Sequence, residues 1–200
     1  MKIIRYLLLT VLFIFLLTVL FVFSGSRTSG RFLTDKEIDL TKSIYSDNID
    51  LANVRIVIDS MYSLTSTITL GNTIHIKSTW TKLDLLLDLT QTSSSRNLLI
   101  HELGHVYQYQ SGGWGYVARS LFAQAKAYIS TGSRGNAYKW EDRISDKTPW
   151  EEWNPEEQAQ AISDYSYYIE FGKGLYSNDK VLVKNLDCFV PILKTNFCRN

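Results

Sequence analysis

The segment His101-Glu102-Leu103-Gly104-His105 constrains the fold more than any other part of the sequence. It contains two of the three histidines of the chain, four residues apart. On a helix, residues at this spacing lie on one face with Cβ atoms roughly 5–6 Å apart, so both imidazoles can bind one ion. If the two rings share an ion, this segment has to be helical.

The residues around the two histidines predict such a helix. Leu99, Leu103 and Val106 recur at spacings of three and four, which is typical of a helix with one buried stripe. Three serines at 93–95 offer N-cap hydroxyls, and two glycines at 112–113 can end the helix. We therefore expect one continuous helix to carry both histidines.

The chemistry of these residues points to zinc. A zinc ion binds nitrogen ligands at about 2.0–2.1 Å, and this helix face can supply two of them, from His101 and His105. Glu102 is turned one residue around the helix, so its carboxylate more plausibly reaches a water molecule at the metal than the metal itself. Two histidine ligands with a glutamate general base are typical of zinc hydrolases. We predict these roles for His101, His105 and Glu102.

A catalytic zinc usually has three protein ligands and an open position. No histidine follows His105, so a downstream ligand has to be a carboxylate. Glu156 is the first candidate and Glu157 the alternative. Both also have a structural explanation, because Asn154 is a good N-cap, Pro155 suits the first helical position, and acidic residues favour the first turn. The residues alone leave the choice open.

The two segments together resemble the gluzincin class of zinc metallopeptidases, in which a glutamate on a later helix completes the His-Glu-x-x-His site. The segment 156–159 (Glu-Glu-Gln-Ala) is similar to the one that supplies that glutamate in membrane-associated gluzincins. The chain also resembles small bacterial metallopeptidase domains, some associated with secretion systems. The resemblance implies that Glu156 is the third ligand, that Zn²⁺ is the cofactor, and that the substrate is a peptide or protein.

The same resemblance implies a zincin-like fold, in which an edge hairpin packs beside the active-site helix and pairs with extended substrate. One residue departs from the pattern: membrane-associated families often carry Asp where this chain has Gln160. Asp164, one turn further along, could replace that Asp as the residue that supports the metal ligands from outside the coordination sphere. Tyr107, Tyr116 and Tyr165 are candidate oxyanion donors.

The order of the elements predicts an α+β architecture, because strand-like segments precede most helical ones. Residues 54–59, 65–70 and 73–78 are expected strands, and Gly71-Asn72 predicts a tight hairpin turn between the last two. Further helices are expected at 34–45, 116–130 and 154–170. The helix at 116–130 has an apolar stripe at 117, 121, 125 and 129. His75, on an expected strand, is interpreted as a hydrogen-bonded or exposed residue.

The N-terminus has a different character. Residues 6–23 are 18 consecutive uncharged residues, preceded by Lys2 and Arg5. As a helix they would span about 27 Å, near the thickness of a bilayer core. We therefore predict a transmembrane helix in residues 1–24, a tether at 25–31 and the metallopeptidase domain at 32–200; a cleaved signal sequence is the alternative for 1–24. The basic residues should stay in the cytoplasm. The domain is then expected outside it, periplasmic or extracellular, and secreted if the segment is cleaved.

Charge and cysteines limit the partners and the compartment. The 21 Lys and Arg residues nearly balance the 20 Asp and Glu residues, so the chain has no basic excess to hold nucleic acid, and we expect no such partner. Cys188 and Cys198 are expected to form a disulfide outside the cytosol, the alternative being two unlinked cysteines.

These features predict a membrane-tethered zinc metallopeptidase with Glu102 as general base. The alternative is a non-catalytic, zinc-containing envelope binding or assembly module. A third hypothesis is a structural domain in which the motif is accidental.

Overall fold

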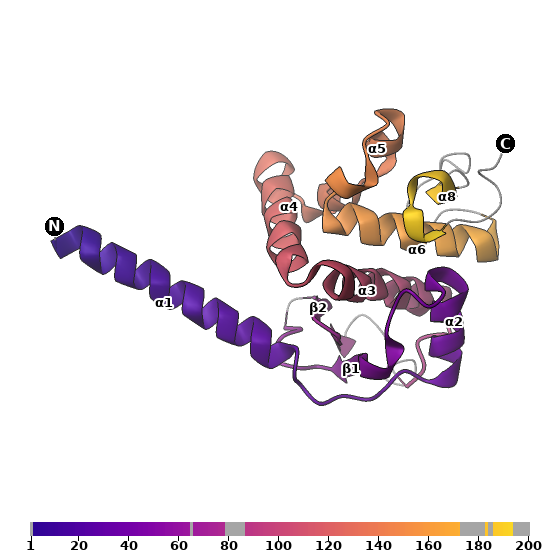
Figure 1. The fold of residues 1–200 in the computed structure, drawn as a ribbon, viewed down its shortest axis with the longest axis horizontal. Helices are drawn as coiled ribbons and strands as arrows, with labels where there is room; N and C mark the ends of the chain where they lie inside the picture. The colour runs from indigo at the N-terminus through magenta and orange to yellow at the C-terminus, as the bar shows by residue number, and fades with distance from the viewer. Residues whose placement is uncertain (1, 65, 79–86, 173–182, 184–185, 194–200) are drawn as a thin grey trace.

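The computed structural model describes residues 2–64, 66–78, 87–172, 183 and 186–193, which are mostly helical with one small sheet (Figure 1). The α-helices are α1 (Lys2–Gly25), α2 (Asp35–Tyr45), α3 (Ser93–Gly112), α4 (Gly115–Thr131), α5 (Glu141–Ser145), α6 (Pro155–Phe171) and α8 (Leu186–Phe189). The strands are β1 (Arg55–Ile58), β2 (Ile68–Leu70) and β3 (Thr73–Ile76). Short 3-10 helices are η1 (Leu51–Asn53), η4 (Arg134–Tyr138), η5 (Trp150–Glu152) and η6 (Pro191–Leu193).

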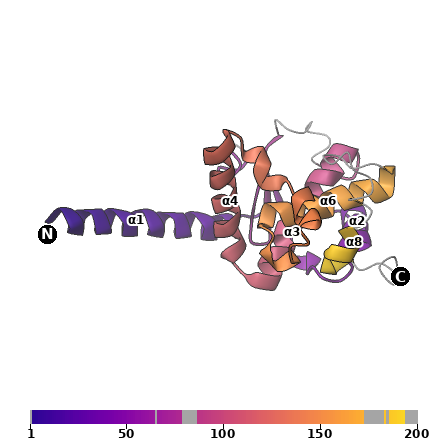
Figure 2. The ribbon, with the colours of Figure 1, turned by 90° about the horizontal axis from the view of Figure 1, so that it is seen from above.

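The prediction of an α+β fold is wrong, because the chain is mostly helical. All three expected strands form, but each is only three or four residues long. A sheet this small covers one side of α3, and α6 packs against the other side (Figures 1 and 2). Leu99, Ile100, Leu103 and Val106 of α3 are fully buried between these layers. Helix packing therefore supplies most of the core.

The sheet has the order β1-β3-β2, with β1 parallel and β2 antiparallel to β3. The hairpin predicted at Gly71-Asn72 is confirmed, and Gly71 has a φ of 64°, which glycine adopts without strain. β2 is one of the two edge strands of this sheet and lies next to α3. The hairpin thus places a strand edge beside the helix that carries both histidines.

The two helices that carry the predicted ligands begin at side-chain caps. Thr92 caps α3, one residue before the expected serines, in a reciprocal pair with Ser95. Asn154 caps α6 and Pro155 opens it, as predicted. Local hydrogen bonding therefore sets the first residue of both helices.

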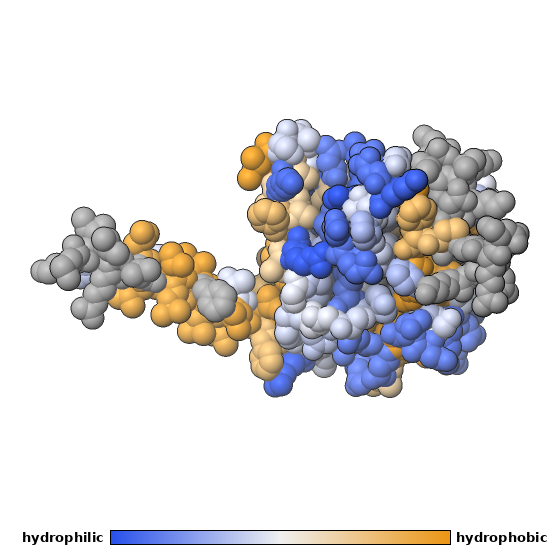
Figure 3. Space-filling model, turned by 45° about the horizontal axis from the view of Figure 1, so that its top comes forward, coloured by the Kyte–Doolittle hydropathy of each residue, from blue (hydrophilic) through white to orange (hydrophobic). Residues whose placement is uncertain are grey.

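α1 projects away from the rest of the chain (Figures 1 and 2), and its described side chains are largely hydrophobic (Figure 3). Among the described residues, no helix is long and apolar enough to cross a membrane, so the predicted N-terminal transmembrane helix is not supported. The C-terminal end of α1 contacts the domain. His75 Nε2 donates to the Gly25 carbonyl at 3.0 Å, and the Ser24 and Tyr62 hydroxyls are 2.7 Å apart.

His75 is a structural residue, as its interpretation from the sequence implied. Besides the bond to Gly25, its Nδ1 lies 2.7 Å from the Ser60 hydroxyl, and the residue is fully buried. Burial, opposed by the bond to Gly25, lowers its pKa. The predicted pairing of Cys188 with Cys198 involves Cys198, which lies outside the described residues.

Candidate metal centre

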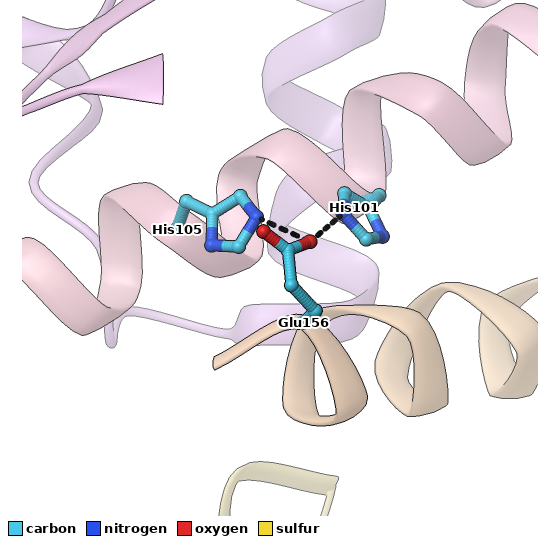
Figure 4. Close-up of side chains that lie close together, drawn as sticks. All are labelled: His101, His105 and Glu156. Carbon is cyan, nitrogen blue, oxygen red and sulfur yellow. Dashed lines mark ion pairs between the residues drawn. The ribbon is translucent and has the colours of Figure 1, made fainter. Parts of the chain in front are cut away.

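The structure brings His101, His105 and Glu156 together (Figure 4). The histidines lie one turn apart on α3, with ring centroids 5.1 Å apart. Glu156 is in the first turn of α6, and its Oε2 lies 3.4 Å from Nε2 of each histidine. All three side chains are buried or nearly so. The group could hold a metal ion.

The spacing of the three atoms fits a metal better than direct hydrogen bonds. Tetrahedral ligands at zinc bond lengths of 2.0–2.1 Å lie about 3.3 Å apart, close to the observed 3.4 Å. A charge-assisted N–H···O bond is shorter, at about 2.7–2.9 Å. Glu156 Oε2 is buried and accepts no hydrogen bond from any residue that the structure describes. A buried carboxylate oxygen without a donor is costly unless a cation binds it.

The electrostatics of the group also favour a cation. Burial opposes the charge on His105, but Glu156 outweighs burial and raises the pKa of His105 to about 9. Burial likewise opposes the charge on Glu156, yet His105 and His101 hold its pKa well below the usual value. The carboxylate is therefore ionised and draws positive charge into the space between the rings.

His105 is oriented by Gln108, one turn further along α3. The Gln108 amide nitrogen donates to the Pro155 carbonyl at 2.9 Å and to Gln158 Oε1 at 3.0 Å. Its carbonyl oxygen is therefore the acceptor for His105 Nδ1, at 2.8 Å. In the neutral ring, which a metal requires, the proton therefore lies on Nδ1 and the lone pair of Nε2 faces Glu156. Gln108 has no distinctive spacing in the sequence that would have marked this role.

Glu156 is held in turn by α4. Gln124 Nε2 donates to Glu156 Oε1 at 2.7 Å, and the Ser120 hydroxyl donates to the same oxygen. Neither residue was predicted, because Ser and Gln are common and no local pattern sets these two apart.

Glu102 lies in the wall of a cavity of about 330 Å³ that also contains the three clustered side chains. It is 6% exposed, and the Thr69 hydroxyl donates to its Oε2 at 2.6 Å. Thr69 lies on the edge strand β2. The carboxylate predicted to be the base thus projects from α3 and is hydrogen-bonded to the neighbouring edge strand β2.

The structure distinguishes Glu156 from Glu157, the two candidates for the third ligand between which the residues alone could not choose. Glu156 faces the histidines, whereas Glu157 pairs with Arg143 at 3.0 Å and accepts from the Asn154 backbone at 2.9 Å. Glu157 is therefore engaged as a helix cap. Asp164 accepts from Trp140 Nε1 at 2.9 Å.

The tyrosines divide differently from expectation. Tyr107 and Tyr165 pack on the hydrophobic core. Tyr116 lines the cavity, but its hydroxyl donates to the Thr69 carbonyl at 2.8 Å and accepts from Gly71 N at 3.1 Å. Tyr138, which was not predicted, also lines the cavity, with its ring 5.8 Å from that of His101. Burial and nearby Glu156 raise its pKa, so its hydroxyl keeps its proton.

Comparison with known proteins gives a fold but no family. No family model and no curated protein matches the chain. The effector domain of Pseudomonas aeruginosa VgrG2b is similar in structure, with a TM-score of 0.58 and 19% sequence identity. The match covers 82% of this chain and 85% of that one. The chain therefore shares its fold with that effector domain.

Proposed function

We propose that this chain is a zinc-dependent hydrolase of peptide bonds, with His101, His105 and Glu156 as ligands and Glu102 as general base. The observation that carries the proposal is the position of Glu156 Oε2, 3.4 Å from both imidazole nitrogens. Two imidazoles and one carboxylate form a ligand set that suits catalytic zinc. This is also the ligand set of the gluzincins that the sequence resembles.

Bound zinc would supply Lewis acidity, which lowers the pKa of water and polarises a carbonyl. The remaining steps belong to the side chains. Glu102 has one oxygen bonded to Thr69, so the other is available to take a proton from the attacking water and return it to the leaving amine. The protonated hydroxyl of Tyr138 lies in the same cavity and can donate to a developing oxyanion.

The edge strand supports a peptide substrate. β2 pairs with β3 on one side, and no other described strand pairs with it. Residues 66–69 run along the cavity that contains Glu102. An extended peptide could add to this edge through backbone hydrogen bonds. The fold shared with a domain described as an effector supports an active rather than a structural role.

Substitution of Glu102 by Gln in the full chain tests the proposal. We expect stoichiometric zinc, measured by elemental analysis, to remain, and hydrolysis of denatured casein to fall by about 10²–10⁴-fold. Glu152→Gln is the control, because Glu152 is exposed in η5 and does not line the cavity. Unchanged hydrolysis in Glu102→Gln would refute the assigned base. Zinc binding without hydrolysis in the unaltered chain would favour the non-catalytic module.

A further inference from the structure

α4 has a polar buried face, which an ordinary amphipathic helix would not have. The apolar stripe expected from the sequence is not buried in the core: Leu121 is 52% and Ile129 85% exposed, and Val117 and Leu121 line the cavity of the metal centre. The buried residues of this helix are Tyr116, Ser120 and Ala127. Apolar burial therefore explains little of the packing of α4.

The polar contacts of this face converge on one atom. Ser120 and Gln124 are four residues apart, so they lie on one side of the helix. Both donate to Glu156 Oε1, and Gln124 Nε2 also lies 3.3 Å from the Ser120 hydroxyl. The three groups form a closed triangle at the edge of the metal centre.

This triangle makes the two oxygens of Glu156 unequal. Oε1 accepts two hydrogen bonds, whereas Oε2 accepts none from the described residues and faces both imidazoles. A carboxylate can bind a metal through one oxygen or through both. Turning Oε1 toward the histidines would break both bonds from α4.

We propose that Ser120 and Gln124 are positioning residues that restrict Glu156 to binding the metal through Oε2 alone. They thereby keep a coordination position open for water. The inference rests on the metal site of the proposed function, but it does not require peptide hydrolysis.

The test uses four single variants of the full chain and one double variant. Ser120→Ala and Gln124→Met each remove one donor with little change in volume, whereas Ser120→Thr keeps the hydroxyl. Lys126→Leu is the control, because Lys126 is an exposed residue of the same helix. Zinc affinity is measured by competition with a chromogenic chelator. The absorption spectrum of the Co²⁺-substituted protein reports the coordination number.

We expect zinc binding to weaken about 10–100-fold in Ser120→Ala and in Gln124→Met, as for other residues that orient metal ligands. The Co²⁺ spectrum should shift toward higher coordination in the double variant Ser120→Ala/Gln124→Met. Ser120→Thr and Lys126→Leu should match the unaltered chain. Thermal unfolding of the metal-free single variants should change little, because Glu156 Oε1 keeps one donor in each of them.

Three results would overturn the inference. The double variant could bind zinc with full affinity and an unaltered Co²⁺ spectrum, the unaltered chain could bind no metal, or the loss of affinity could merely follow a loss of metal-free stability. A chain that binds zinc but hydrolyses no peptide would end the proposed function and leave this inference standing.

Discussion

Gly104 lies inside the histidine motif where α6 packs against α3. Its replacement by Ala would test how strongly zinc affinity depends on the distance between these two helices. A Cβ atom at this position would lie 3.1 Å from both Cα and Cβ of Ala159 and 3.3 Å from the Tyr45 hydroxyl. Tyr45 is fully buried and donates to the Ile100 carbonyl at 2.7 Å, so it has little freedom to move. The strain therefore falls on α6.

The size of the effect follows from these distances. Carbon atoms pack at about 3.5–4.0 Å, so α6 has to retreat by about 0.5 Å. Such overpacking costs about 1–3 kcal/mol. The better helix propensity of Ala returns about 1 kcal/mol, which leaves a net loss of roughly 0–2 kcal/mol.

The metal centre should respond more strongly than the stability does. Ala159 lies one turn after Glu156 on α6, so the carboxylate retreats with the helix. The distance of 3.4 Å from Glu156 Oε2 to each histidine would lengthen by more than the 0.2 Å or so that metal sites tolerate. We expect zinc affinity to fall at least about 10-fold, as it does when ligand orientation is lost.

Chelator competition and urea unfolding of the metal-free protein measure the two effects separately. Gly112→Ala is the matched control, because Gly112 lies in the last turn of the same helix and a Cβ there meets nothing within 4 Å. It should leave zinc affinity unchanged. If Gly104→Ala binds zinc as tightly as Gly112→Ala does, the contact between α3 and α6 does not set the ligand geometry.

Two further results are expected. Zinc at a thousandfold excess over its Kd should stabilise the protein by about 4 kcal/mol, so a chelator should lower Tm by roughly 8–16 °C; an unchanged Tm would contradict a metal that joins α3 to α6. His75 has a lowered native pKa, so the unfolded chain takes up its proton first, and stability should fall as the pH drops below about 6.5. Urea unfolding of the zinc-loaded protein at pH 7.5 and 5.5 measures this loss, which should shrink in His75→Gln; an equal loss in both proteins would exclude His75 as its source.

Local patterns predicted several elements correctly and one fold class wrongly. The motif helix, the hairpin at Gly71-Asn72 and the cap at Asn154 all depend on residues close in sequence, and all three are confirmed. The fold class depends on how far each strand extends, and the packing of the strands against the rest of the chain decides that length. For the same reason the apolar stripe of α4 was found but its direction was not. A helical period shows that two faces differ, not which one the rest of the chain covers.

Short-range physics in the sequence was enough to place two imidazoles on one helix face, with Glu102 beside them, and to begin α6 at a capped turn with two glutamates. Capping and charge left open which glutamate meets the histidines; the resemblance implied Glu156, and the tertiary structure places it there. It also brought Gln108, Ser120, Gln124 and Thr69 to the site. Periodicity and capping act over a few residues, whereas the hydrogen bonds that tie α6 to α3 and to α4 join residues more than thirty positions apart through the packing of whole helices.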